Sequence, residues 1–98
     1  SPRFMRPEDL AVLRQLTDDI YQDFTSRLNS RFTNLTDVDI QLCILIKLGF
    51  SISQIAILTA ISPTSVSQQK SRTKKRIQQQ EPDCFAEGET LDLWLRKF

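Results

Sequence analysis

The sequence predicts an all-α domain built on a helix-turn-helix: a three-helix core with a long N-terminal helix and a short C-terminal helix. Three observations lead to this prediction. Apolar residues recur at steps of three and four along much of the chain, which is the spacing of a helix face. Good helix-capping residues stand directly before the expected helices. Residues 62–77 carry five Lys or Arg and no Asp or Glu, although the whole chain has a net charge of only +1.

The first expected helix is long and amphipathic, covering about residues 8–30. Pro7 suits a first helical turn, and Glu8 and Asp9 are favourable beside the positive end of a helix dipole. The apolar residues of this segment follow the helical spacing: Leu10, Leu13, Leu16, Ile20, Phe24 and Leu28. This stripe is expected either to cover the core of the domain or to pair with a second copy of the chain.

The second expected helix should be the most buried one. Thr36 is a good N-cap, Asp37 and Asp39 lie in the first turn, and the residues up to Leu48 are apolar on nearly every side. Gly49 is expected to end the helix because glycine adopts positive φ without steric cost.

Two more helices should follow, separated by a tight turn. Ser51 and Gln54 have the spacing of a capping box, and Ser62 followed by Pro63 is an N-cap with proline at the first helical position. This order of cap, helix, turn, cap and helix is what a helix-turn-helix requires. The centre of the core is expected to contain Ile44, Ile55, Leu58 and Val66.

The C-terminal segment is expected to be a loop around Pro82 and Gly88, followed by a helix over residues 91–98. Its apolar face comprises Leu91, Trp94, Leu95 and Phe98. A helix this short has no independent stability, so it should dock on helix 8–30, within one chain or across a dimer. The chain is thus divided into a linker and long helix (1–34), the helix-turn-helix (35–80), and a loop with a docking helix (81–98).

The helix over about 63–78 provides the candidate binding residues. If Val66 points inward, a helical wheel predicts that Thr73 and Ile77 point inward as well. It places Lys70 at the edge of the core, with its ammonium group reaching the solvent. Amides and hydroxyls can bond base edges, and Lys and Arg can bind phosphates or guanine. Alternatively, the cations only stabilise the helix dipole and stay solvated. The candidate DNA-binding residues are Thr64, Ser65, Ser67, Gln68, Gln69, Ser71, Arg72, Lys75 and Arg76.

The composition argues against an enzyme. The chain has no histidine, no Gly-rich phosphate loop and no nucleophile beside a base, so no cofactor or catalytic residue is expected. The two cysteines, Cys43 in an apolar helix and Cys84 in a polar loop, favour neither a zinc site nor a disulfide framework, and a reducing cytoplasm is expected. No apolar run is long enough to span a membrane. The chain begins with Ser-Pro, and we expect it to be a piece of a longer protein.

The segments LTDVDIQLC, IKLGFSISQIA and ISPTSVSQQKSRTKKRI resemble the LuxR-type (GerE-type) helix-turn-helix of bacterial transcription regulators, in a variant found in Bacteroidetes-like proteins. The resemblance covers residues 35–77 and, loosely, the upstream helix and the WLRKF tail. It depends on residues that recur together at fixed spacing: Gly49, Ser51, Ile55, Ala56, Ile61, Ser62 and Val66. The chain departs from the family at Gln54, usually Glu, at Lys70 and Thr73, usually apolar, and at Ser53 and Ser67, where Lys is common.

The resemblance implies a four-helix module that binds double-stranded DNA without catalysis, usually beside a regulatory domain in the same chain. Ser65, Ser67, Gln68 and Gln69 correspond to the part of the family's recognition helix that contacts the groove. It also implies a homodimer, here through helix 8–30, the C-terminal helix or both, with no membrane contact. The alternative is a protein-interaction module like region four of sigma factors, which binds a partner helix or a polymerase subunit.

Overall fold

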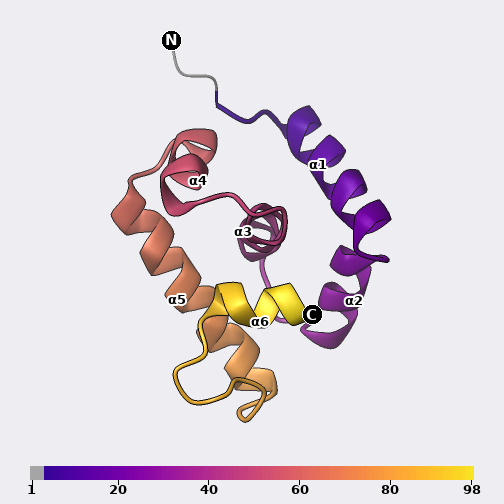
Figure 1. Cartoon of the computed structure of the whole chain (residues 1–98), viewed down its shortest axis with the longest axis vertical. Helices are drawn as coiled ribbons and strands as arrows, with labels where there is room; N and C mark the ends of the chain where they lie inside the picture. The colour runs from indigo at the N-terminus through magenta and orange to yellow at the C-terminus, as the bar shows by residue number, and fades with distance from the viewer. Residues whose placement is uncertain (1–3) are drawn as a thin grey trace.

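The computed structural model describes residues 4–98, and this part of the chain contains six α-helices joined by loops (Figure 1). They are α1 (Pro7–Ile20), α2 (Phe24–Arg31), α3 (Asp37–Lys47), α4 (Ile52–Thr59), α5 (Pro63–Gln80) and α6 (Leu91–Lys97). No strand occurs in this range, so the all-α prediction is confirmed. None of these helices is long and apolar enough to cross a membrane.

Helix α3 lies in the centre of the molecule. Figure 1 views it almost end-on, with the other helices arranged around it, and it contacts α1, α2, α5 and α6. Seven of its eleven residues are buried, because its apolar side chains point in nearly every direction and neighbours cover most of them. The prediction that this helix is the most buried one is confirmed.

The prediction of a single helix over residues 8–30 is wrong, because the chain breaks between α1 and α2. Gln22 and Asp23 adopt left-handed backbone angles, with φ of 46° and 56°. The carboxylate of Asp18 holds the start of α2, accepting hydrogen bonds from the backbone N (2.7 Å) and the hydroxyl of Thr25. The apolar spacing runs unchanged through the break and therefore could not reveal it.

The helix ends expected between residues 36 and 63 are confirmed. Thr36 and Ser51 form capping boxes at the starts of α3 and α4, and Ser62 accepts a hydrogen bond from the backbone of the first turn of α5. Gly49, with φ of +91°, lies just beyond the end of α3. The turn between α4 and α5 passes through Ala60 in the left-handed region, which is uncommon for a residue with a side chain.

Helix α6 docks within the same chain, which was one of the two expected arrangements. Its residues Leu91, Trp94 and Leu95 are buried. It lies mainly against α3 and α5, not against the predicted helix 8–30. The tail meets that region only through α2, where the ring of Phe98 packs edge-on against Phe24 at 5.9 Å. Figure 1 shows α6 crossing the molecule between α5 and α2.

An aromatic stack fixes the loop between α5 and α6. The Trp94 ring is stacked between Phe85, at 5.0 Å, and Phe98, at 5.1 Å. Its indole N–H donates to the backbone carbonyl of Cys84 at 3.0 Å, so this buried polar group is satisfied. The loop and the helix therefore hold each other in place.

The expected core is confirmed at Ile44, Ile55 and Val66, which are at most 1% exposed. Leu58 is only half-buried and packs at the edge of the core. Its backbone carbonyl accepts a hydrogen bond from the backbone N of Met5 (2.8 Å), which ties the N-terminal segment to the end of α4. The prediction that Leu58 lies at the centre of the core is therefore wrong, because it lies at the boundary.

We expect Ile55→Ala to lower the free energy of unfolding by about 2–5 kcal/mol, because Ile55 is fully buried between helices and its truncation leaves a cavity. Ile52→Ala is the matched control, since Ile52 lies on the same helix but is 37% exposed, and it should cost about 1 kcal/mol or less. Urea unfolding followed by circular dichroism measures both. Equal losses for the two variants would contradict the packing of α4 described here.

Candidate nucleic-acid interface

Helix α5 presents one face to the core and the opposite face to solvent. Val66, Thr73 and Ile77 are fully buried, as the helical wheel predicted. Proline at the first helical position and the cap by Ser62 start the helix at the expected residue. The inward face therefore fixes which side chains of α5 can be reached from outside.

Six of the nine candidate DNA-binding residues lie on the exposed face of α5, and we call them the α5 polar face: Thr64, Ser67, Gln68, Ser71, Arg72 and Lys75. They offer hydroxyl, amide and cationic groups and include no carboxylate. The sequence from Ile40 to Gln80 contains no acidic residue, so α4 and α5 themselves carry no carboxylate. The other three candidates, Ser65, Gln69 and Arg76, are half-buried.

Gln69 and Arg76 are turned toward the buried carboxylate of Asp39 on α3. Arg76 Nη1 lies 2.8 and 2.9 Å from the two carboxylate oxygens, and Gln69 Nε2 lies 2.8 Å from Oδ1. The hydroxyl of Thr73 donates to Oδ1 and the backbone N of Thr36 donates to Oδ2. The two candidates thus act within the chain, where they hold α5 against α3.

The protonation of Asp39 follows from these contacts. Burial raises the pKa of its carboxyl group, but hydrogen bonds from Thr73 and Thr36 and the positive charge of Arg76 outweigh burial, and the pKa lies below its usual value. The group is therefore ionised at neutral pH. Sequence reasoning treated Asp39 only as a favourable charge in a first helical turn, and its position in an otherwise apolar helix was the signal for a buried partner.

Ser65 belongs to the N-terminal cap of α5. Its backbone N donates to the hydroxyl oxygen of Ser62 at 3.1 Å, and the Ser62 hydroxyl donates to its side-chain oxygen at 2.9 Å. These bonds satisfy groups in the first turn that have no partner within the helix. The side chain of Ser65 is consequently less free to bind a ligand than its neighbours on the α5 polar face.

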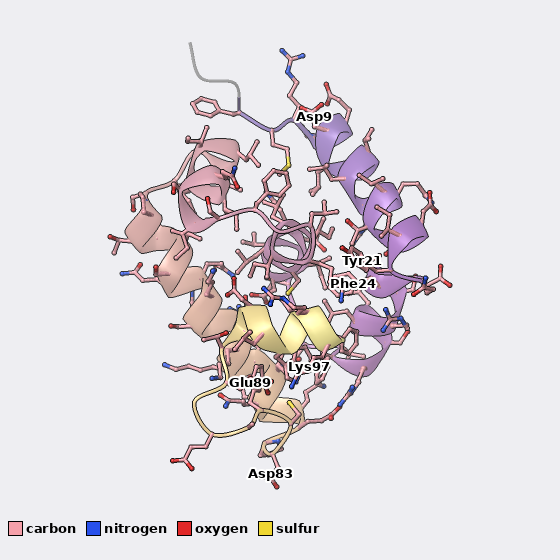
Figure 2. All side chains as sticks on the ribbon, viewed as in Figure 1. Asp9, Tyr21, Phe24, Asp83, Glu89 and Lys97 are labelled. Atoms are coloured by element: carbon pink, nitrogen blue, oxygen red, sulfur yellow. The ribbon has the colours of Figure 1, made fainter. Side chains whose placement is uncertain are left out.

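The C-terminal segment contacts two further cations of α5. Lys70 forms an ion pair with Asp92 of α6 at 3.0 Å, so the expected solvated ammonium meets a carboxylate instead. Lys74 donates to the backbone carbonyl of Glu89 and lies over the ring of Phe85, 4.8 Å from its centroid. Figure 2 shows Glu89 in the loop before α6.

The free positive charge of the α5 polar face therefore comes from Arg72 and Lys75. None of the ion pairs found in residues 4–98 involves either of them. Arg72 makes only a long contact of 3.3 Å with the amide oxygen of Gln69. The helical wheel already turned Arg72 and Lys75 outward and left Lys70 at the edge of the core, but it could not separate Arg76 from these two cations, because Asp39, the partner of Arg76, is 37 residues away.

The loop between α2 and α3 lies beside the C-terminal half of α5 and was not among the candidates. Asn34 donates through Nδ2 to the backbone carbonyl of Arg76 at 2.8 Å, and Gln80 donates to the hydroxyl of Thr33 at 3.2 Å. In the sequence this segment is only the connection between two expected helices. These contacts extend the polar surface next to α5 and hold the end of the helix.

The described residues do not assemble a metal site, since no three His, Cys, Asp or Glu side chains come close enough to hold an ion. Both cysteines are free thiols. Cys43 is fully buried, as expected for a small apolar side chain, and its burial raises the pKa of the thiol far above the usual value.

The comparisons with known proteins add no relative. The chain matches no protein family, no curated protein and no solved structure. The LuxR-type resemblance therefore stays a prediction from the residues that carry it.

We expect Asp39→Asn to lower the free energy of unfolding by about 3 kcal/mol at neutral pH, because Arg76 would lose its buried counter-charge. Asp37→Asn is the control, since Asp37 is an exposed acid in the same helical turn, and it should cost about 1 kcal/mol or less. Thermal or urea unfolding of the three proteins measures the difference.

The pH dependence has a definite sign. The pKa of Asp39 is lower in the folded than in the unfolded chain. Ionised Asp39 therefore contributes fully to the free energy of unfolding above about pH 5, and this contribution is lost as the pH falls through the folded pKa. The stability difference between wild type and Asp39→Asn should thus shrink on acidification. A difference that stays constant down to about pH 2 would contradict an ionised Asp39.

Proposed function

We propose that α4 and α5 form a helix-turn-helix that binds double-stranded DNA, in the DNA-binding module of a bacterial, cytoplasmic transcription regulator. The observation that supports this most strongly is the α5 polar face. A surface of hydroxyls, amides and two unpaired cations, with no carboxylate along the helix, is chemically suited to a groove bounded by phosphates.

The arrangement of the two helices is consistent with this function. α4 packs directly on α5, and the two are joined by a tight turn through Ala60. The buried Val66 and Thr73 keep the opposite side of α5 turned outward. In a helix-turn-helix the second helix enters the major groove, its N-terminal residues contact base edges and later residues contact the backbone.

These positions assign different roles to the candidate residues. Thr64, Ser67 and Gln68, in the first half of α5, would contact base edges, and Gln68 can bond adenine through two hydrogen bonds. Ser71, Arg72 and Lys75 would contact phosphates. Ser65, Gln69 and Arg76 would act indirectly, since their contacts with Ser62 and Asp39 set the start and the orientation of α5. Six residues would thus contact DNA directly, fewer than the nine candidates predicted from the sequence.

The electrostatic part of the binding should be modest. With Lys70 and Arg76 in ion pairs and Lys74 bonded to the backbone carbonyl of Glu89, α5 brings two remaining cations, Arg72 and Lys75, to the DNA. Each phosphate neutralised contributes about −0.9 to the slope of log K against log salt, so α5 alone accounts for a slope of roughly −2. Sequence preference would then depend more on base contacts than on attraction to the backbone.

A protein-interaction module remains the second candidate function. It is favoured by an apolar groove of about 240 Å³ between α3, α4 and the first half of α5. Val38 and Ile61 line this groove and are 57% and 44% exposed, so an apolar side chain of a partner helix could enter. A DNA mobility assay at two salt concentrations distinguishes the functions, because only DNA binding weakens steeply through counterion release.

Arg72→Ala and Lys75→Ala should each weaken binding about equally to all duplexes and reduce the salt slope by about 0.9, because each removes one phosphate contact. The control is Arg14→Ala, which removes an exposed arginine of α1 and should change neither quantity. Fluorescence anisotropy with a labelled duplex, selected from a random-sequence library and titrated at several salt concentrations, measures both. Unchanged affinity in the α5 variants, with the fold intact, would count against the proposal.

Gln68→Ala should relax the preference at one base position and cost about 1–3 kcal/mol in binding to the preferred sequence, with little effect on random duplexes. Gln15→Ala, which removes an exposed amide on α1, is the matched control. Competition between the selected duplex and its single-base variants measures the effect. A uniform loss over all sequences would instead assign Gln68 to the backbone.

A further inference from the structure

The outward side of α1 carries an apolar row that nothing in the described chain covers. Val12, Leu16 and Ile20 follow one another at steps of four and are 66%, 44% and 49% exposed. The break after Ile20 explains this exposure. Beyond it α2 turns the next apolar residues of the stripe, Phe24 and Leu28, fully into the core.

An apolar groove continues this row at the start of α1. Its volume is about 370 Å³, and its walls include Phe4, Leu13, Phe50 and Leu58. Val12 belongs both to the row and to the groove, so the two form one surface, which we call the α1 apolar face. In Figure 1 the chain enters between α4 and α1 at this end of the molecule.

The border of the α1 apolar face is acidic. At 100° per residue, Glu8 and Asp19 lie within about 40° of Val12 on the helix, and Asp9 lines the groove. Arg14 is the only basic residue of α1 and points to the opposite side, at about 200° from Val12. One nearby cation, Arg6, precedes the helix and lies 3.9 Å from Glu8. Figure 2 labels Asp9 at the exposed start of α1.

This border argues against a second copy of the chain as the occupant. If two α1 helices packed through these rows, Glu8, Asp9 and Asp19 of both copies would crowd around one small apolar contact, and like charges across an interface are unfavourable. The sequence predicted a homodimer through helix 8–30, the C-terminal helix or both. The apolar face of α6 is already buried within the chain, which leaves α1 as the exposed apolar helix of that pair.

We propose that the α1 apolar face binds an amphipathic helix of another protein whose polar side is basic. Residues at steps of four form a ridge on a helix, and such ridges pack between the ridges of a second helix at a crossing angle near −50°. A partner helix with apolar residues at i, i+4 and i+7 would place them on the row and in the groove. Its Lys and Arg would meet the acidic border.

This inference does not rest on DNA binding. Figure 1 shows α1 and α5 on opposite sides of the central α3, so a helix bound to α1 leaves the α5 polar face open. The partner could thus be held while α5 is engaged elsewhere. Loss of DNA binding and loss of helix binding would be caused by different substitutions.

The test uses the whole chain and two synthetic probes. Both are fluorescein-labelled 18-residue helical peptides with Leu at i, i+4 and i+7 positions, one with Lys and one with Glu at the polar positions. In anisotropy titrations at physiological salt, the Lys peptide should bind at least tenfold more tightly than the Glu peptide. The double variant Val12→Ser with Leu16→Ser should weaken the binding of the Lys peptide at least tenfold. Asp19→Asn should weaken this binding less, and the effect of Asp19→Asn should disappear at high salt.

Leu93→Ser is the matched control, because Leu93 is a 47% exposed apolar residue on α6, and it should leave peptide binding unchanged. Circular dichroism verifies the fold, and Asp19→Asn tests the surface even if the double variant unfolds. Sedimentation of the chain without peptide measures whether the α1 apolar face binds a second copy of the chain instead. A dimer that dissociates with Leu16→Ser would assign the face to a second copy, and equal binding of both peptides or an unaffected double variant would also overturn the proposal.

Discussion

The buried carboxylate of Asp39 is the interaction on which the presentation of α5 depends. An ionised group inside the core is very unfavourable unless it is paired and hydrogen-bonded, and Asp39 lies in the central helix with no exposed surface. Arg76, Gln69 and Thr73 must therefore all point toward it, and together they fix the rotation of α5 about its axis. That rotation decides which side chains form the α5 polar face. A rotation of α5 about its axis would turn Gln68 and Arg72 together away from their present outward direction.

The C-terminal segment also determines which cations of α5 are free. It pairs Lys70 with Asp92, and Lys74 donates to the backbone carbonyl of Glu89 and lies over the ring of Phe85, so these two cations are held within the chain. The five Lys and Arg residues of α5 therefore fall into two groups. Three of them hold the fold together, and Arg72 and Lys75 stay free for an external partner. These two cations give the α5 polar face a positive charge although the net charge of the whole chain is only +1, because α5 itself carries no acid.

Two surfaces of different chemistry lie on opposite sides of α3. The α5 polar face suits a hydrated, negatively charged groove, whereas the α1 apolar face suits the apolar side of another helix. The helix break between α1 and α2 produces this second surface, because it lets α2 fill the core while α1 turns part of its stripe outward. A domain arranged in this way could connect one partner to another through a rigid central helix.

The sequence by itself determined the features that depend on local interactions. The caps at Thr36, Ser51 and Ser62, the glycine after α3 and the apolar spacing act over a few residues, so helix starts, helix ends and the burial of α3 could be predicted. Only the tertiary structure decided the rest. The break after Ile20 depends on a turn that the apolar period does not record, and the docking of α6 on α3 depends on which faces the other helices leave open. Gln69 and Arg76 likewise meet Asp39, 30 and 37 residues away in sequence, only because α5 packs on α3, and this contact removes them from the candidate binding residues.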